Sequence, residues 1–174
     1  MDPLPLLARL EAFPAGLRAV CAAVGEVDEA WRPAGEGWCL REVVAHLADE
    51  EVEDFPARLE LLLAGHEGAL PPIDPEGWVL ERAYAAKPVA ESLERFARAR
   101  SATVARLRAR LNAPDRVDWS RSWSHPRLGD LRAGDLLGAL AAHDALHLRQ
   151  VARLLHGLAE RDAAPWQVGY AGGW

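Results

Sequence analysis

Two histidines lie four residues apart in an apolar, helix-forming stretch, AAHDALHLRQ, at residues 141–150. His143 and His147 belong to a stripe with steps of three and four residues, which is one face of a helix. Residues at i and i+4 are neighbours on a helix, so two imidazole nitrogens here can bind one metal ion at about 2.0–2.1 Å. The stripe predicts that both side chains point into a helical core; its other members are Leu136, Leu140, Gln150 and Leu154.

A third histidine, His46, occupies a comparable position in EVVAHLADEE, residues 42–51. It follows Val43 by one turn, on the side that carries apolar residues toward the core. Three imidazoles from two facing helices, with no evident fourth protein ligand, describe a metal site with open positions for water or substrate. The alternative is a polar cluster in the core, because inward histidines are usually hydrogen-bonded core residues and i, i+4 pairs also arise by chance.

Two familiar metal motifs do not match. His143 is followed by Asp144, whereas the HExxH zinc proteases need a glutamate there as general base. A ferritin-like di-iron site needs two Glu-x-x-His helices and two further glutamates, which this sequence lacks. His66, His125 and His156 fall in predicted loops or at a helix end, so we do not select them as ligands.

Acidic residues near the histidines are candidates for orienting an imidazole or accepting a proton. Of Glu42, Glu50 and Asp144, we select Glu50, one turn after His46, as the candidate catalytic residue. Cys39 invites a catalytic role because it is near the site in sequence. Two helical turns separate it from His46, which favours a structural role.

The elements that must carry these residues are four amphipathic helices. Each is defined by apolar residues at helical spacing, and glycine or proline signals mark the ends. Pro14 predicts a kink or restart in the first helix, and Gly157 is predicted to cap the last. The helices are expected at about residues 6–24, 39–64, 88–111 and 131–156.

Two proline- and glycine-containing stretches, residues 65–77 and 115–130, separate the second helix from the third and the third from the fourth. We read both as long ordered connections, and no stretch shows a convincing β alternation. The predicted fold class is therefore all-α, an antiparallel-type four-helix bundle in a single domain, residues 1–174, with long connections between helices 2 and 3 and between helices 3 and 4.

Composition limits the function classes. The formal charge of −6 and the isoelectric point near 5.5 oppose nucleic-acid binding, and we interpret the arginine-rich stretch 95–116 as a solvated helix face. No apolar run reaches the roughly 18 residues that span a bilayer, so no membrane partner is expected. The N-terminus has no basic region before its apolar residues, which favours a cytoplasmic protein, and its two cysteines are expected to be reduced thiols.

Two stretches resemble the DinB/YfiT-like superfamily of metal-binding four-helix bundles. The first is GEGWCLREVVAHLADEE, residues 35–51, which begins with the tryptophan-led motif of that family. The second is SHPRLGDLRAGDLLGALAAHDALHLRQVARLL, residues 124–155, which carries its HP…G…HDxxHxxQ pattern. Their order and separation also fit, so the resemblance spans nearly the whole chain.

The resemblance implies that His46, His143 and His147 bind a divalent ion such as nickel, zinc or iron, with water completing the shell. It also implies homodimers, and a thiol S-transferase or hydrolase that acts on a small molecule in detoxification or stress. In the transferase reaction, the small-molecule partner of the protein would be a low-molecular-weight thiol. The thiol route is favoured, because it does not require a well-placed general base. The alternative function is a non-catalytic metal- or small-ligand-binding stress protein.

Overall fold

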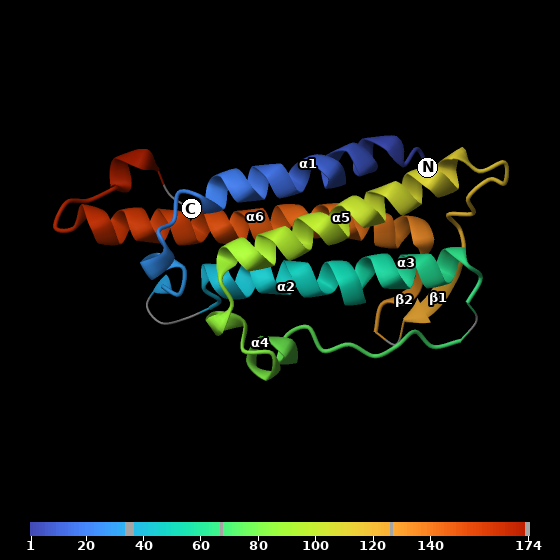
Figure 1. Ribbon diagram of the computed structural model, residues 1–174, viewed down its shortest axis with the longest axis horizontal. Coiled ribbons are helices and arrows are strands. Elements are labelled where there is room, and N and C mark those ends of the chain that lie inside the picture. The colour runs from blue at the N-terminus through green and yellow to red at the C-terminus, as the bar shows by residue number, and fades with distance from the viewer. Residues whose placement is uncertain (34–36, 67, 126, 173–174) are drawn as a thin grey trace.

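The computed structural model describes residues 1–33, 37–66, 68–125 and 127–172. Gly35 and Glu36 of the first motif and Pro126 of the second lie outside the described residues. Four long helical columns pack side by side (Figure 1), which confirms the predicted all-α bundle. The columns are α1 (Leu4–Cys21), α2 (Leu40–Glu53) continued by α3 (Phe55–Leu63), α5 (Val89–Asn112) and α6 (Ala133–Ala163).

Shorter elements lie in the connections: α4 (Gly77–Glu81), the 3₁₀ segments Glu26–Asp28, Tyr84–Ala86 and Gly169–Ala171, and the strands β1 (Ser122–His125) and β2 (Gly129–Arg132). Within the described residues, no helix is both long and apolar enough to cross a membrane.

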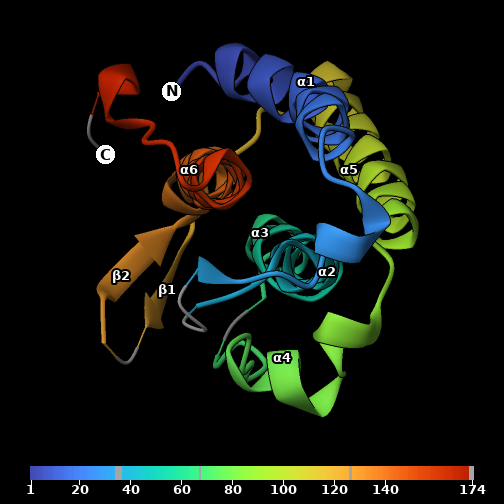
Figure 2. The same cartoon turned by 90° about the vertical axis from the view of Figure 1, so that its left-hand side faces the viewer.

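The bundle includes a parallel pair of neighbouring helices. Figure 1 shows that α2, α3 and α5 run in one direction, whereas α1 and α6 run in the other. Viewed along the bundle in Figure 2, the columns follow one another in the order α6, α1, α5 and α2/α3. Because α5 starts at the same end as α2, the chain must return along the whole bundle between them. The long connection after α3, which includes α4, makes that return.

The predicted second helix is interrupted at Asp54, which separates α2 from α3. Its backbone angles, φ −116° and ψ −103°, lie outside the helical region. Pro56 explains the break, because proline cannot donate a backbone hydrogen bond and its ring clashes with the preceding turn. The carboxylate of Asp54 also forms an ion pair with Arg58, at 2.5 Å. This contact links the residue at the break to α3.

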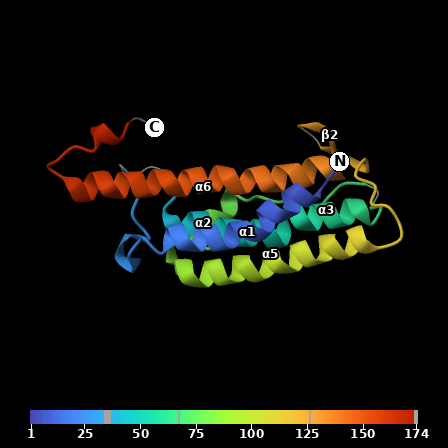
Figure 3. The same cartoon turned by 90° about the horizontal axis from the view of Figure 1, so that it is seen from above.

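Of the predicted kink or restart at Pro14, the restart does not occur, because α1 runs continuously from Leu4 to Cys21. The predicted end of the last helix is wrong. The α6 helix does not end at Gly157 but runs on to Ala163. Gly157 allows Trp31 to pack closely against the helix, because a Cβ atom at this position would lie 2.8 Å from Cη2 of Trp31. In Figure 3 the chain after α6 turns back alongside the end of that helix.

A β-hairpin occupies part of the connection before α6, where no strand was predicted. The strands β1 and β2 pair antiparallel, with Trp123 opposite Leu131. Both of these side chains are half-buried, and Trp123 packs against the apolar cluster at that end of the bundle. Each strand has only four residues, too few for their alternation to stand out in the sequence.

Among the described residues, the core has three apolar clusters. The two larger ones lie at the two ends of the bundle, and a smaller one joins α2 to the connection before α5 through Ala45, Trp78, Val79 and Tyr84. One of the larger clusters includes Val43, Val44 and Leu47 of α2 with Phe96 of α5 and Val151 and Leu154 of α6. The other includes Leu59 and Leu62 of α3 with Val104 of α5 and Leu136, Leu137 and Leu140 of α6. Between these two ends, polar side chains of α2, α5 and α6 meet in what we call the polar layer. Its members are the half-buried His143 and the buried His46, Glu50, Glu51, Arg100, Asp144 and His147.

Candidate metal centre

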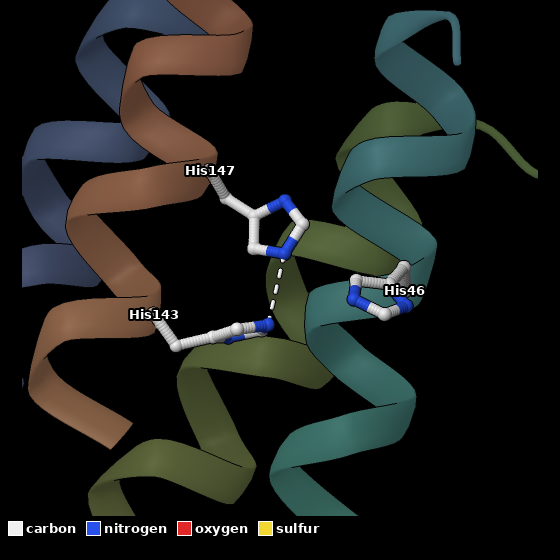
Figure 4. Close-up of side chains that lie close together, drawn as sticks. All are labelled: His46, His143 and His147. Carbon is white, nitrogen blue, oxygen red and sulfur yellow. Dashed lines mark hydrogen bonds between the residues drawn. The ribbon is translucent and has the colours of Figure 1, made fainter. Parts of the chain in front are cut away.

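The three predicted histidines converge in the polar layer. Figure 4 shows His46 on one helix facing His143 and His147 on another, and these helices are α2 and α6. One nitrogen from each ring lies within 4.8 Å of the other two. The Nε2 atoms of His143 and His147 are 2.9 Å apart. Two nitrogens that each bind one ion at 2.0–2.1 Å are separated by roughly 3 Å, so this pair has the spacing that a shared ion requires.

Aromatic rings enclose the histidines. The Trp38 ring lies 4.7 Å from the His46 ring and is stacked on His147 at 6.3 Å, measured between ring centroids. Phe55 lies 5.0 Å from His143. Apolar walls lower the local dielectric constant and limit water access, which strengthens electrostatic interactions inside the site. Phe55, which directly follows the break at Asp54, was not among the residues expected at the site.

Gln150 fixes the orientation of His147. Its side-chain Oε1 lies 2.9 Å from Nδ1 of His147. Because an amide oxygen can only accept, Nδ1 of the neutral imidazole donates to it. The lone pair is then on Nε2, the atom that faces the other histidines. A hydrogen bond of this kind fixes the tautomer and orientation of metal-binding histidines.

Replacing Gln150 by leucine should therefore weaken divalent-ion binding. Loss of such a supporting partner typically reduces metal affinity by about 10- to 100-fold. Calorimetric titration of metal-free protein with Zn²⁺ measures the change. Gln167→Leu is a matched control, because Gln167 is exposed in the C-terminal segment. Equal Zn²⁺ affinities for Gln150→Leu and wild type would contradict this role.

Glu50 is the acidic side chain that faces the histidines. Its Oε2 atom lies 2.9 Å from Nε2 of His143 and 3.4 Å from Nε2 of His46. The atom is buried, yet no contact to it has hydrogen-bond geometry. Burial raises the pKa of Glu50, but the histidines outweigh burial and hold the pKa below its ordinary value. A buried, ionised oxygen without a hydrogen bond, beside three imidazoles, fits the presence of a cation.

The other acidic candidates lie away from the histidine nitrogens. Glu42 accepts hydrogen bonds from the backbone N–H of Cys39 at 2.8 Å and from Arg32 at 2.5 Å, so it caps the start of α2. Asp144 is ion-paired with Arg100. Burial raises the pKa of Cys39, so its thiol stays protonated at neutral pH, which supports the structural interpretation.

The remaining histidines also lie outside the cluster. His66 is exposed, and its Nε2 lies 3.4 Å from the carbonyl of Ala69. Nδ1 of His125 accepts hydrogen bonds from two backbone N–H groups of the hairpin turn. His156 contacts Glu160 at 3.6 Å.

Burial also sets the charge of the histidines. It lowers the pKa of His46, and it lowers the pKa of His147 to about 4, with further lowering from the neighbouring histidines. Both rings are therefore neutral at pH 7. Neutral imidazole is the form that binds a metal ion, so the site does not have to lose these protons before binding.

The lowered pKa of His147 predicts a pH-dependent stability of the metal-free protein. Between pH 6.5 and about 4, the unfolded chain binds a proton at this position more readily than the folded chain. The stabilising contribution is complete above pH 6.5 and is lost as the pH falls through about 4. Between pH 7 and pH 4.5, the loss from this residue should be about 2–3 kcal/mol in the free energy of unfolding.

Urea unfolding of chelator-treated wild type and His147→Leu at several pH values measures this effect. The difference between their two profiles removes contributions from groups that both proteins share. Wild type should lose more stability toward acid than the variant. Parallel profiles would show that His147 does not titrate in this way.

Known proteins resemble this chain in sequence. Residues 9–151 match the family model of the DinB superfamily. A protein from Oceanobacillus iheyensis, named "Putative metal-dependent hydrolase OB0782", is 27% identical over 129 residues, which cover 74% of this chain and 70% of that protein.

A solved structure has the same fold. YfiT from Bacillus subtilis aligns with a TM-score of 0.78 and 22% sequence identity, over 91% of this chain and 88% of that one. That protein is described as "a probable metal-dependent hydrolase with an unusual four-helix bundle topology". The family match covers most of the chain and includes His46, His143 and His147. The chain thus belongs to the DinB superfamily.

Proposed function

We propose that this protein is a metal-dependent hydrolase, in which His46, His143 and His147 hold a divalent ion and Glu50 is the general base. The observation that carries the proposal is the position of Glu50 Oε2, buried without a hydrogen bond and within 3.4 Å of two of the histidines. A group in this position can accept a proton from water held beside the histidines.

The ion would supply Lewis-acid activation of water when bound. The chain supplies the rest. Neutral His46 and His147 offer lone pairs, and Gln150 orients one of them. Glu50 stays ionised because its close contact with His143 outweighs burial and lowers its pKa, so it can take up a proton. The rings of Trp38 and Phe55 shield the proton transfer from bulk water.

Hydrolysis needs a base that thiol transfer does not need. The sequence alone does not place any acidic side chain relative to the histidines, so it identifies no certain general base. For that reason the sequence favoured the thiol route. The described contacts distinguish the candidates: Glu42 and Asp144 are occupied by arginines, whereas Glu50 faces the histidines. This difference moves our preference to hydrolysis of a small molecule. For the metal we propose zinc, nickel or iron, because imidazole nitrogen suits all three.

The test uses protein reconstituted in turn with Zn²⁺, Ni²⁺ and Fe²⁺. One panel contains small esters and amides, and a second combines low-molecular-weight thiols with a chloro-aromatic or an epoxide. We expect metal-dependent turnover in the first panel that His46→Ala abolishes. Conjugation in the second panel alone would overturn hydrolysis in favour of an S-transferase. Metal binding with no turnover in either panel would favour a non-catalytic binding protein.

A further inference from the structure

Arg100 is a buried arginine that joins four helices. Its side chain is 1% exposed and lies on α5, across the bundle from α6 (Figure 2). Its Nε donates to Glu51 Oε2 at 2.9 Å, and Nη1 and Nη2 donate to the two oxygens of Asp144 at 2.6 and 2.9 Å. Nη1 also donates to the carbonyl of Leu10 on α1 at 3.2 Å. The guanidinium thus contacts α1, α2 and α6 from its position on α5.

Both carboxylates are sequence neighbours of residues in the candidate site. Glu51 follows Glu50 on α2, and Asp144 follows His143 on α6. Consecutive residues of a helix point in directions about 100° apart, so these carboxylates contact Arg100 instead of the histidine nitrogens. The two-point contact with Asp144 is directional, because a planar guanidinium and a carboxylate bind in a fixed geometry. Arg100 therefore constrains the rotation and separation of the two helices that carry the site.

Stability alone is a poor explanation for this arrangement. Removing charges from water is costly, and buried ion pairs replaced by well-packed apolar residues often leave stability unchanged or improved. Apolar side chains pack above and below the polar layer, including Phe96 and Val104 on either side of Arg100 along α5. An apolar residue at position 100 would continue that pattern. A role in fixing the geometry of the helices explains why a charged network is found here and not an apolar residue.

We propose that Arg100 is a positioning residue, which holds α2 and α6 so that His46, His143 and His147 are arranged for a divalent ion before it binds. This inference rests on the proposed metal site. It adds that affinity depends on a residue that touches neither the ion nor any of the three histidines in the described contacts.

The experiment compares Co²⁺ binding and the Co²⁺ absorption spectrum in wild type and three variants. Arg100→Met tests the loss of one partner, which leaves two buried carboxylates and can strongly destabilise the fold. The triple variant Arg100→Met, Glu51→Leu, Asp144→Leu removes the whole network and avoids that penalty. The control is Arg110→Met, which breaks the ion pair of Arg110 with Glu60 between α5 and α3, outside the polar layer.

We expect the triple variant to unfold at a temperature near that of the wild type, but to bind Co²⁺ about 10- to 100-fold more weakly and with an altered spectrum. Arg110→Met should bind as wild type does. A folded triple variant with wild-type affinity and spectrum would overturn the positioning role and leave the metal site intact. Wild type that binds no Co²⁺ would instead overturn the metal site, and the inference with it.

Discussion

Replacing His143 and His147 together by alanine is expected to abolish divalent-ion binding. Both nitrogens belong to the cluster that spans 4.8 Å, and His46 alone cannot hold an ion tightly. Removing one supporting partner of a ligand costs about 10- to 100-fold in affinity, so removing two ligands should cost more than about 100-fold. Elemental analysis of untagged protein and calorimetric titration with Zn²⁺ measure the loss.

Thermal unfolding provides a second measurement. An ion that binds only the folded state stabilises it by about 2.7 kcal/mol at a concentration 100 times its dissociation constant. Wild type should gain this stability from Zn²⁺, and the double variant should not. His66→Ala is the control, because His66 is exposed and lies outside the cluster. Wild type without metal and without a Zn²⁺ effect would identify the three imidazoles as a polar cluster of the core.

The pairing of His143 with His147 could be predicted because it depends on local helix geometry, whereas the meeting of His46 with this pair depends on contact between α2 and α6 and was implied by the family resemblance. Spacing of four residues puts His143 and His147 on one face of a helix, and the surrounding leucines identify that face as the inner one. The same reasoning applies to Glu50, which follows His46 by four residues. In each pair, the helix itself places the two side chains on the same face. The sequence then has only to show that this face points into the bundle.

Features that depend on contacts between helices could not be predicted in this way. Arg100 is one arginine among several on α5, and its position gives no sign that two acids from other helices meet it. The parallel course of α2 and α5 depends on the path of the connection between them. Gly157 resembles a helix end in sequence, but its neighbour Trp31 lies more than a hundred residues away.

The break at Asp54 lies between these cases. Pro56 is visible in the sequence and disfavours a continuous helix. The apolar pattern nevertheless continues across the break, since Leu59 and Leu62 of α3 are buried as the residues of α2 are. The helix pattern therefore concealed a break just before Phe55, the residue that packs against His143.

Replacing Glu50 by glutamine is expected to reduce turnover strongly without removing the metal. Glutamine has nearly the same shape, so the packing around His46 and His143 should persist, but its amide cannot accept the proton. General-base catalysis typically contributes about 10²- to 10⁴-fold, and kcat should fall within that range. The measurement is kcat and KM for the ester or amide that the first panel identifies, together with the Zn²⁺ content of each protein.

Glu53→Gln is the matched control, because Glu53 lies on the same helix but pairs with Arg82 at the surface. It should retain wild-type kcat, KM and Zn²⁺ content. A different role for Glu50 would give a different pattern. If its carboxylate is a metal ligand, Glu50→Gln should lose Zn²⁺ affinity together with activity. If it only stabilises the fold, the variant should unfold at lower temperature and keep its kcat. Only loss of kcat with Zn²⁺ retained supports Glu50 as the base.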